Sequence, residues 1–120
     1  MKLALILASL YGMSGVILGA FGAHALKDRF TPDQLVSWET GVRYQLFHAV
    51  ALLVIALLMD KGIALKPTMF LFALGTILFS GSIYLLCFEV GVKGLWALTP
   101  IGGVLLILGW VGILVAAIKL

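Results

Sequence analysis

The sequence predicts an all-α membrane protein in which four transmembrane helices form a compact up-down bundle. Of its 120 residues, 63% are hydrophobic and 11% are charged, whereas a soluble domain carries about a quarter charged residues. The apolar residues fall into four runs, and the first of them supplies the roughly 20 residues that a helix needs to cross a hydrocarbon core about 30 Å thick. We therefore expect one integral membrane domain over residues 1–120, with spans at roughly 3–26, 44–59, 67–88 and 100–118.

The charged and sulfur-containing residues exclude several classes of protein. The formal net charge is +3, but the eight lysines and arginines stand singly between apolar runs. No basic stripe exists for a nucleic acid partner. Cys87 is the single cysteine, so neither an internal disulfide nor a multi-cysteine metal site is possible. We expect no metal and no cofactor.

The first apolar run, 3–26, has some features of a cleavable signal peptide. Lys2 precedes it, and Ala23-His24-Ala25 imitates a cleavage site of small residues. A signal core is about 7 to 15 residues long, and this run is longer. We therefore expect a permanent first helix.

A stripe of glycines marks one face of this first helix. Gly12, Gly15, Gly19 and Gly22 are spaced by alternating steps of three and four residues. Such a face lets another helix approach closely, which is how membrane helices gain packing energy. No strand precedes the stripe, so a phosphate-binding glycine loop is disfavoured. The stripe predicts a helix-packing seam.

The second helix has a strong start signal at Thr31-Pro32. Thr31 can cap the helix, and Gln34 stands where a capping-box partner belongs. The helix that follows is too long to lie wholly in lipid, so we expect an interfacial extension at 32–43 and a buried part at 44–59. Glu39 precedes Arg43 by four residues, the favourable order for a helical ion pair worth about 0.3–0.5 kcal/mol.

Prolines also mark the starts predicted for the third and fourth helices. Pro67 follows a short turn at 60–66, and Thr99-Pro100 repeats the cap-then-proline pattern. Gly109 and Gly112 lie on one side of the fourth span and predict a further packing seam.

The unusual polar residues approach one membrane side. With four spans, segments 27–43 and 89–99 share a side, here named the loop side, while the chain ends and turn 60–66 share the end side. His24, Gln45, His48 and Glu89 all approach the loop side, and Gln45 and His48 share a helix face. One interpretation is a site for a proton, a cation or a solute. The commoner finding is polar groups satisfied by neighbouring helices, and two histidines and one glutamate without motif spacing are weak evidence for zinc.

The cations leave the orientation almost balanced. The end side has four lysines and the amino terminus, against Lys27, Arg29, Arg43 and Lys93 on the loop side. Arg43 contributes less to the positive charge of the loop side if it lies within the helix beside Glu39. The positive-inside rule then favours both termini in the cytoplasm.

Several segments of the chain carry distinctive motifs, at residues 19–24, 38, 40–45, 47–49, 79–82 and 99–103. Together these segments resemble a known family, the small bacterial inner-membrane proteins catalogued as domain of unknown function 423. The resemblance implies a compact four-helix protein of the plasma membrane with no assigned activity, and it supplies no catalytic residues. Its signature positions are Gly19, Gly22, His24, Gly41, Tyr44, Gln45, His48, Pro100 and Gly102.

The sequence leaves two functions open and makes a third the least supported. The first is a non-enzymatic membrane protein that acts through contacts with lipid, with its own copies or with a larger partner. The alternative is a small oligomeric transporter or channel component for a proton, cation or small polar solute, using Gln45, His48 and Glu89. An enzyme would need a nucleophile with a base, and Ser80 and Ser82 have none nearby in sequence.

Overall fold

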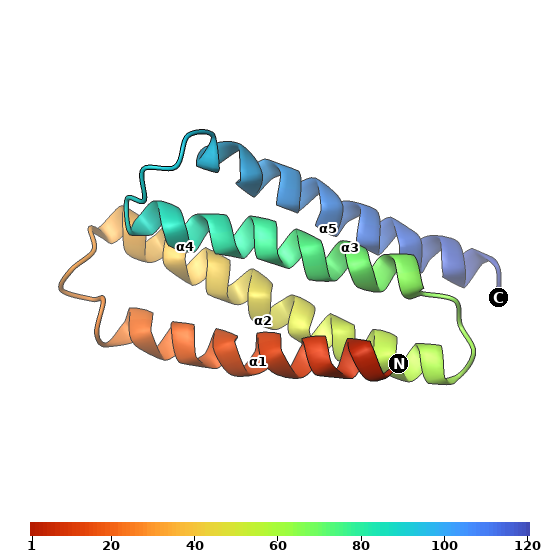
Figure 1. Ribbon diagram of the computed structural model, residues 1–120. Coiled ribbons are helices and arrows are strands. Elements are labelled where there is room, and N and C mark those ends of the chain that lie inside the picture. Colours follow the sequence, from red (N-terminus) through yellow and green to blue (C-terminus); the bar gives the residue numbers. More distant parts are fainter.

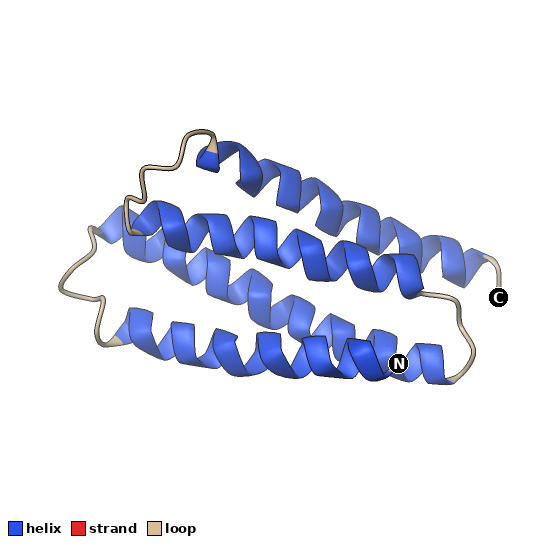
Figure 2. Cartoon of the chain, viewed as in Figure 1, coloured by secondary structure: helices blue, strands red, loops and turns tan.

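The computed structural model describes all 120 residues and contains only helices and turns (Figures 1 and 2). The elements are α1 (Lys2–Ala23), α2 (Pro32–Asp60), α3 (Lys66–Thr76), the π-helix η1 (Ile77–Gly81), α4 (Ser82–Cys87) and α5 (Leu95–Ile118). Because α3, η1 and α4 follow without a break, they form one rod. The four rods run alternately up and down (Figure 1), and each is long and apolar enough to cross a membrane. The predicted all-α fold with four spans is confirmed.

The bundle is built from two helical hairpins. α1 packs mainly on α2, while α3 and η1 pack mainly on α5. The hairpins meet where α2 lies against α3 and α4. The principal axes measure 49 × 27 × 19 Å, so the molecule is flattened. One buried cluster surrounds Leu52, Ile55 and Phe72, and a smaller one surrounds Trp38 near the loop side.

The predicted capping box at the start of α2 is confirmed. Thr31 Oγ1 accepts a hydrogen bond from the Gln34 amide at 3.2 Å, and Gln34 Oε1 accepts one from the Thr31 amide at 2.9 Å. Gln34 Nε2 also donates to the Cys87 carbonyl on α4 at 3.2 Å. The first turn of α2 is therefore held against the second hairpin.

The start predicted for the fourth helix was wrong. α5 begins at Leu95 rather than Pro100, after Gly94 with φ of +79°. Glycine adopts this left-handed conformation readily, and the turn that it makes lets the helix begin before Thr99. Pro100 lies inside the helix. Thr99, the expected cap, instead shares a hydrogen bond with the Ser82 hydroxyl.

The π-helix within the third rod has no signal in the sequence. A π turn inserts an extra residue into a helix, and this one lies where two glycines of other helices approach. A methyl group built at Gly41 of α2 would lie 2.9 Å from Tyr84, and one at Gly102 of α5 would lie 2.8 Å from the Gly75 carbonyl oxygen. Ser80 within the π turn donates to the Gly41 carbonyl at 2.7 Å.

Candidate functional site

Gln45 lies at the centre of a buried polar network that joins three helices. Its side chain is 6% exposed. Nε2 donates to the Tyr11 carbonyl at 3.0 Å and to the Ser14 hydroxyl at 2.7 Å, both on α1. Oε1 accepts from the Tyr84 hydroxyl on α4 at 2.7 Å. Both amide hydrogens are therefore used inside the protein.

His48 is held in one neutral tautomer. Its Nδ1 lies 2.8 Å from the Tyr44 carbonyl, and its Nε2 lies 3.1 Å from Nε1 of Trp110 on α5. A carbonyl can only accept and an indole N–H can only donate, so Nδ1 carries the hydrogen and Nε2 is the acceptor. No ring lone pair remains free. His48 could bind a metal or take up a proton only by giving up its bond to Trp110.

Further hydrogen bonds tie the helices together. The Tyr11 hydroxyl donates to the Ala73 carbonyl of α3 at 2.7 Å. Trp38 Nε1 donates to the Leu18 carbonyl of α1 at 2.8 Å. With Gln45, His48, Ser80 and Ser82, these bonds connect every rod to at least one other. The polar side chains are therefore placed as interhelical ties.

Thr76 differs from these residues. Its side chain is 3% exposed, and its hydroxyl has no hydrogen-bond partner. Thr76 ends α3 directly before the π turn. π turns occur frequently at functional sites, and a buried polar atom without a partner requires an explanation.

The four residues of the predicted polar cluster are not gathered in one place. His24 caps the C-terminal end of α1 and Glu89 follows α4 with φ of +57°, and both side chains are exposed. His24 lies ten residues beyond the Gln45 partner Ser14, about 15 Å along the helix. Gln45 and His48 are buried but turn toward different neighbours. No group of three or more His, Cys, Asp or Glu residues could hold a metal ion.

The expected ion pair between Glu39 and Arg43 is not formed. Both residues are exposed on α2, and no nitrogen–oxygen distance within 4.0 Å joins them. Holding two long side chains in one geometry costs conformational entropy, and the small electrostatic energy of an exposed ion pair barely offsets this cost. Arg43 is thus a cation within a membrane helix without a carboxylate partner.

The glycine stripe of α1 faces α2. Methyl groups built at Gly15, Gly19 and Gly22 would lie 2.6 Å, 3.2 Å and 2.5 Å from the nearest side-chain atoms of α2, while one at Gly12 would lie 3.9 Å away. On α5, Gly109 faces the Phe72 ring and Gly112 faces Thr68.

Two cavities form a groove between α2 and α5. The first, of about 300 Å³, is lined by Arg43, Tyr44, Phe47, His48 and Trp110. The second, of about 400 Å³, is lined by eight hydrophobic residues and shares Phe47 and Trp110 with the first. The groove therefore runs from a cation into an apolar trough.

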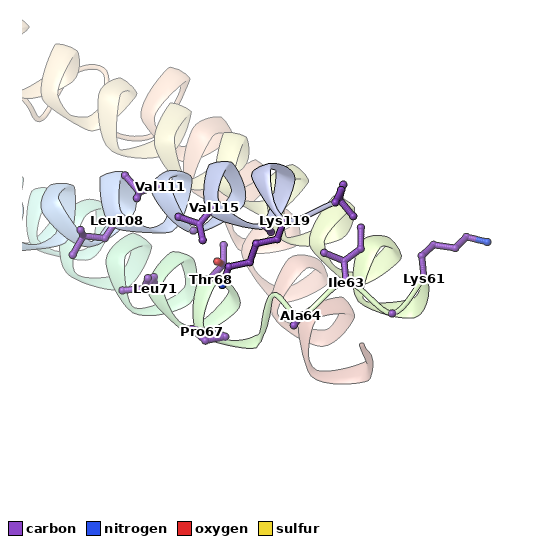
Figure 3. A pocket seen from close by; sticks show the side chains of 14 residues that line it. Lys61, Ile63, Ala64, Pro67, Thr68, Leu71, Leu108, Val111, Val115 and Lys119 are labelled. Carbon is purple, nitrogen blue, oxygen red and sulfur yellow. The ribbon is translucent and has the colours of Figure 1, made fainter.

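A larger cavity of about 720 Å³ lies at the end side, between α3, α5 and the turn after α2 (Figure 3). Eight of its fourteen lining residues are hydrophobic. In Figure 3 the Lys119 side chain runs back toward Thr68, whereas Lys61 points away from the bundle.

Sequence reasoning missed four partners in this network: Tyr11, Ser14, Tyr84 and Trp110. A signal was present for three of them, because Tyr11, Tyr84 and Trp110 lie inside apolar runs rather than at their edges, where tyrosine and tryptophan of membrane helices usually gather. Their specific partners lie 31 to 62 residues away, beyond any local pattern.

Comparison with known proteins identifies the relatives of this chain. Residues 18–103 match the family described as protein of unknown function DUF423. The membrane protein YwdK of Bacillus subtilis (UPF0382) is 43% identical over 99% of this chain and 98% of its own length. The inner membrane protein YgdD of Escherichia coli K12 (UPF0382) is 42% identical over 99% of this chain and 92% of its own. No solved structure matches. The chain belongs to the DUF423 family of membrane proteins of unknown function.

Proposed function

We propose that this protein is a non-enzymatic membrane protein that acts through its outer surface, by contacts with lipid, a second copy or a larger membrane partner. The observation that carries the proposal is the use of Gln45 and His48. Both amide hydrogens of Gln45 and both ring nitrogens of His48 are engaged with other groups of the bundle. These hydrogen bonds stabilise helix packing. They leave neither residue a free donor hydrogen or ring lone pair with which to bind a solute.

The serine hydroxyls support the same proposal. Ser80 donates to the Gly41 carbonyl, and Ser82 donates to the Phe79 carbonyl at 2.9 Å. A serine nucleophile needs a base that accepts its hydrogen. Here backbone carbonyls accept these hydrogens, and neither ring nitrogen of His48 is free.

A transporter or channel component is the second candidate, and Thr76 is the observation that favours it. The unpartnered hydroxyl beside a π turn gives one buried polar group that a passing solute or proton-carrying water could meet. Four helices enclose little of a path, so this candidate requires an oligomer.

A flux experiment with matched variants separates the two candidates. Wild-type protein, His48→Phe and Thr76→Val would be reconstituted in vesicles containing a pH-sensitive dye, and the free energy of unfolding of each would be measured. The proposal predicts flux equal to that of empty vesicles, together with reduced stability of His48→Phe. Wild-type flux that Thr76→Val or His48→Phe abolishes would favour the transporter instead.

We further propose that the protein lies in the bacterial inner membrane with both termini in the cytoplasm. The name of the Escherichia coli relative, an inner membrane protein, supports the location. The orientation rests on the end-side lysines Lys2, Lys61, Lys66 and Lys119. Green fluorescent protein fused after Leu120 should fluoresce, whereas alkaline phosphatase at the same position should be inactive. The reverse result would place the termini outside.

A further inference from the structure

The groove between α2 and α5 combines a cation at shallow membrane depth with an apolar trough. Gly22, near the end of α1, lies against Trp38 of α2. Arg43 follows Trp38 by five residues, so it lies about 7 Å inside the end of α1 at 1.5 Å per residue. Because a transmembrane helix ends where the headgroups begin, and the apolar span of α1 ends at Ala23, we place Arg43 near the boundary between headgroups and acyl chains.

Arg43 has no internal partner at this depth. Its side chain makes no ion pair within 4.0 Å, and no carboxylate lines the first cavity of the groove. Arginine stays protonated in proteins, and charged residues within membrane helices are costly unless they find a partner. An anion that reaches Arg43 from outside the protein would satisfy this charge.

The walls of the groove indicate the rest of the ligand. Tyr44, Phe47 and Trp110 are 42%, 62% and 43% exposed, so they present aromatic surface beside Arg43. Beyond them, the second cavity is entirely hydrophobic and reaches Leu58. From Arg43 to Leu58 the helix rises about 22 Å, more than one leaflet of a hydrocarbon core about 30 Å thick. An acyl chain fits this length and chemistry.

We propose that the groove binds a glycerophospholipid of the loop-side leaflet, with its phosphate diester on the Arg43 guanidinium and one acyl chain along the second cavity. A guanidinium matches two phosphate oxygens at once. An anionic headgroup is preferred, because the ammonium of a zwitterionic lipid competes for the phosphate. This inference rests on the proposed function, since it names lipid as what the outer surface contacts.

Native mass spectrometry tests the site. The protein in non-ionic detergent is titrated with palmitoyl-oleoyl phosphatidylglycerol, with phosphatidylcholine and diacylglycerol of the same chains as comparisons. We expect one phosphatidylglycerol to bind most tightly and diacylglycerol to bind most weakly. Glycerol 3-phosphate should not displace the lipid; displacement at equal concentration would assign the site to a free phosphate.

Variants identify the residues. Arg43→Gln should weaken phosphatidylglycerol binding about tenfold or more, as expected for loss of a charge-assisted hydrogen bond, and Arg43→Lys should weaken it less. Val54→Trp, which fills the trough, should weaken binding of all three lipids. The matched control is Lys119→Gln in the end-side cavity, which should change nothing.

Three outcomes overturn the inference. These are equal affinity of Arg43→Gln and wild type, an equal loss in Lys119→Gln, or a lipid-free dimer that Val54→Trp dissociates. The last would assign the groove to a second copy of the chain. The flux experiment is independent of all three, so the proposed function can stand when this site fails.

Discussion

Along α1 the glycines meet side chains of α2, whereas along α5 the glycine at position 102 meets backbone. A methyl group at Gly15 would press on Leu46 Cδ2, the end of a flexible side chain. One at Gly102 would press on the Gly75 carbonyl oxygen and on Phe79 Cα, each 2.8 Å away. A side chain can change rotamer, but two helix backbones in contact must separate. Glycine stripes that look alike in sequence therefore differ in how strictly they exclude alanine.

The largest effect should come from Gly102→Ala. Separating α5 from the third rod should lower the free energy of unfolding by about 3 kcal/mol, the upper range for overpacking. Circular dichroism during titration of mixed micelles with sodium dodecyl sulfate would measure it. The matched control is Gly103→Ala, where the new methyl group would lie 3.7 Å from the Phe79 ring. Equal losses at both positions would contradict a backbone contact specific to Gly102.

The next effect concerns the polar tie between the hairpins. Gln45→Leu should lower the free energy of unfolding by about 2 kcal/mol, because it leaves the hydroxyl of the half-buried Tyr84 without its acceptor. Tyr84→Phe in the Gln45→Leu background should then cost less than Tyr84→Phe alone. A double-mutant cycle in the same assay measures this coupling, and strictly additive losses would show that the two side chains act independently.

A smaller loss should follow removal of the bond between α2 and α5. Trp110→Phe keeps an aromatic ring against Phe72 but removes the donor to His48. Hydrogen bonds between membrane helices contribute about 0.6 kcal/mol on average, so we expect a loss near 1 kcal/mol. The chemical shift of His48 Nε2 should also change, because this nitrogen loses its donor while the Tyr44 carbonyl still holds the hydrogen on Nδ1. Unchanged shifts would argue against this hydrogen bond.

The smallest effects should lie on α1. Gly15→Ala should cost about 1 kcal/mol, since Leu46 must move. Gly12→Ala should be neutral or slightly stabilising, because the methyl group has room and alanine favours a helix over glycine by about 1 kcal/mol. Both variants can be compared in the same unfolding assay. A larger loss at Gly12 than at Gly15 would mean that side-chain clearance does not set the order.

The fold was predictable because its signals are local. Four apolar runs define the spans, and Thr31 with Gln34 defines the start of α2. The error at α5 arose because Thr99-Pro100 carries the same local pattern as Thr31-Pro32. Two features distinguish the starts: Gly102 stands where Gln34 completes the capping box of α2, and Gly94 in its left-handed conformation lets α5 begin earlier.

The arrangement of polar side chains was not predictable to the same degree. The spacing of residues on α2 correctly predicted that Gln45 and His48 face into the bundle. It could not predict that Tyr84 and Trp110 are their partners. Those bonds depend on the angles at which helices cross and on the extra residue of the π turn. Neither feature produces a periodic pattern in the sequence, because apolar residues suit the bundle interior and the lipid-facing surface equally well.

The two-hairpin construction bears on how the chain enters a membrane. α1 finds its main partner in α2, and α3 finds its own in α5, so each hairpin's contacts are close in sequence. During synthesis the first hairpin can complete its glycine seam before the second has left the ribosome. Protein domains generally fold N-terminal first as the chain emerges, and we expect the same order for these two hairpins. The hydrogen bonds between the two hairpins, such as Gln45 to Tyr84 and His48 to Trp110, can form only after both hairpins have been inserted.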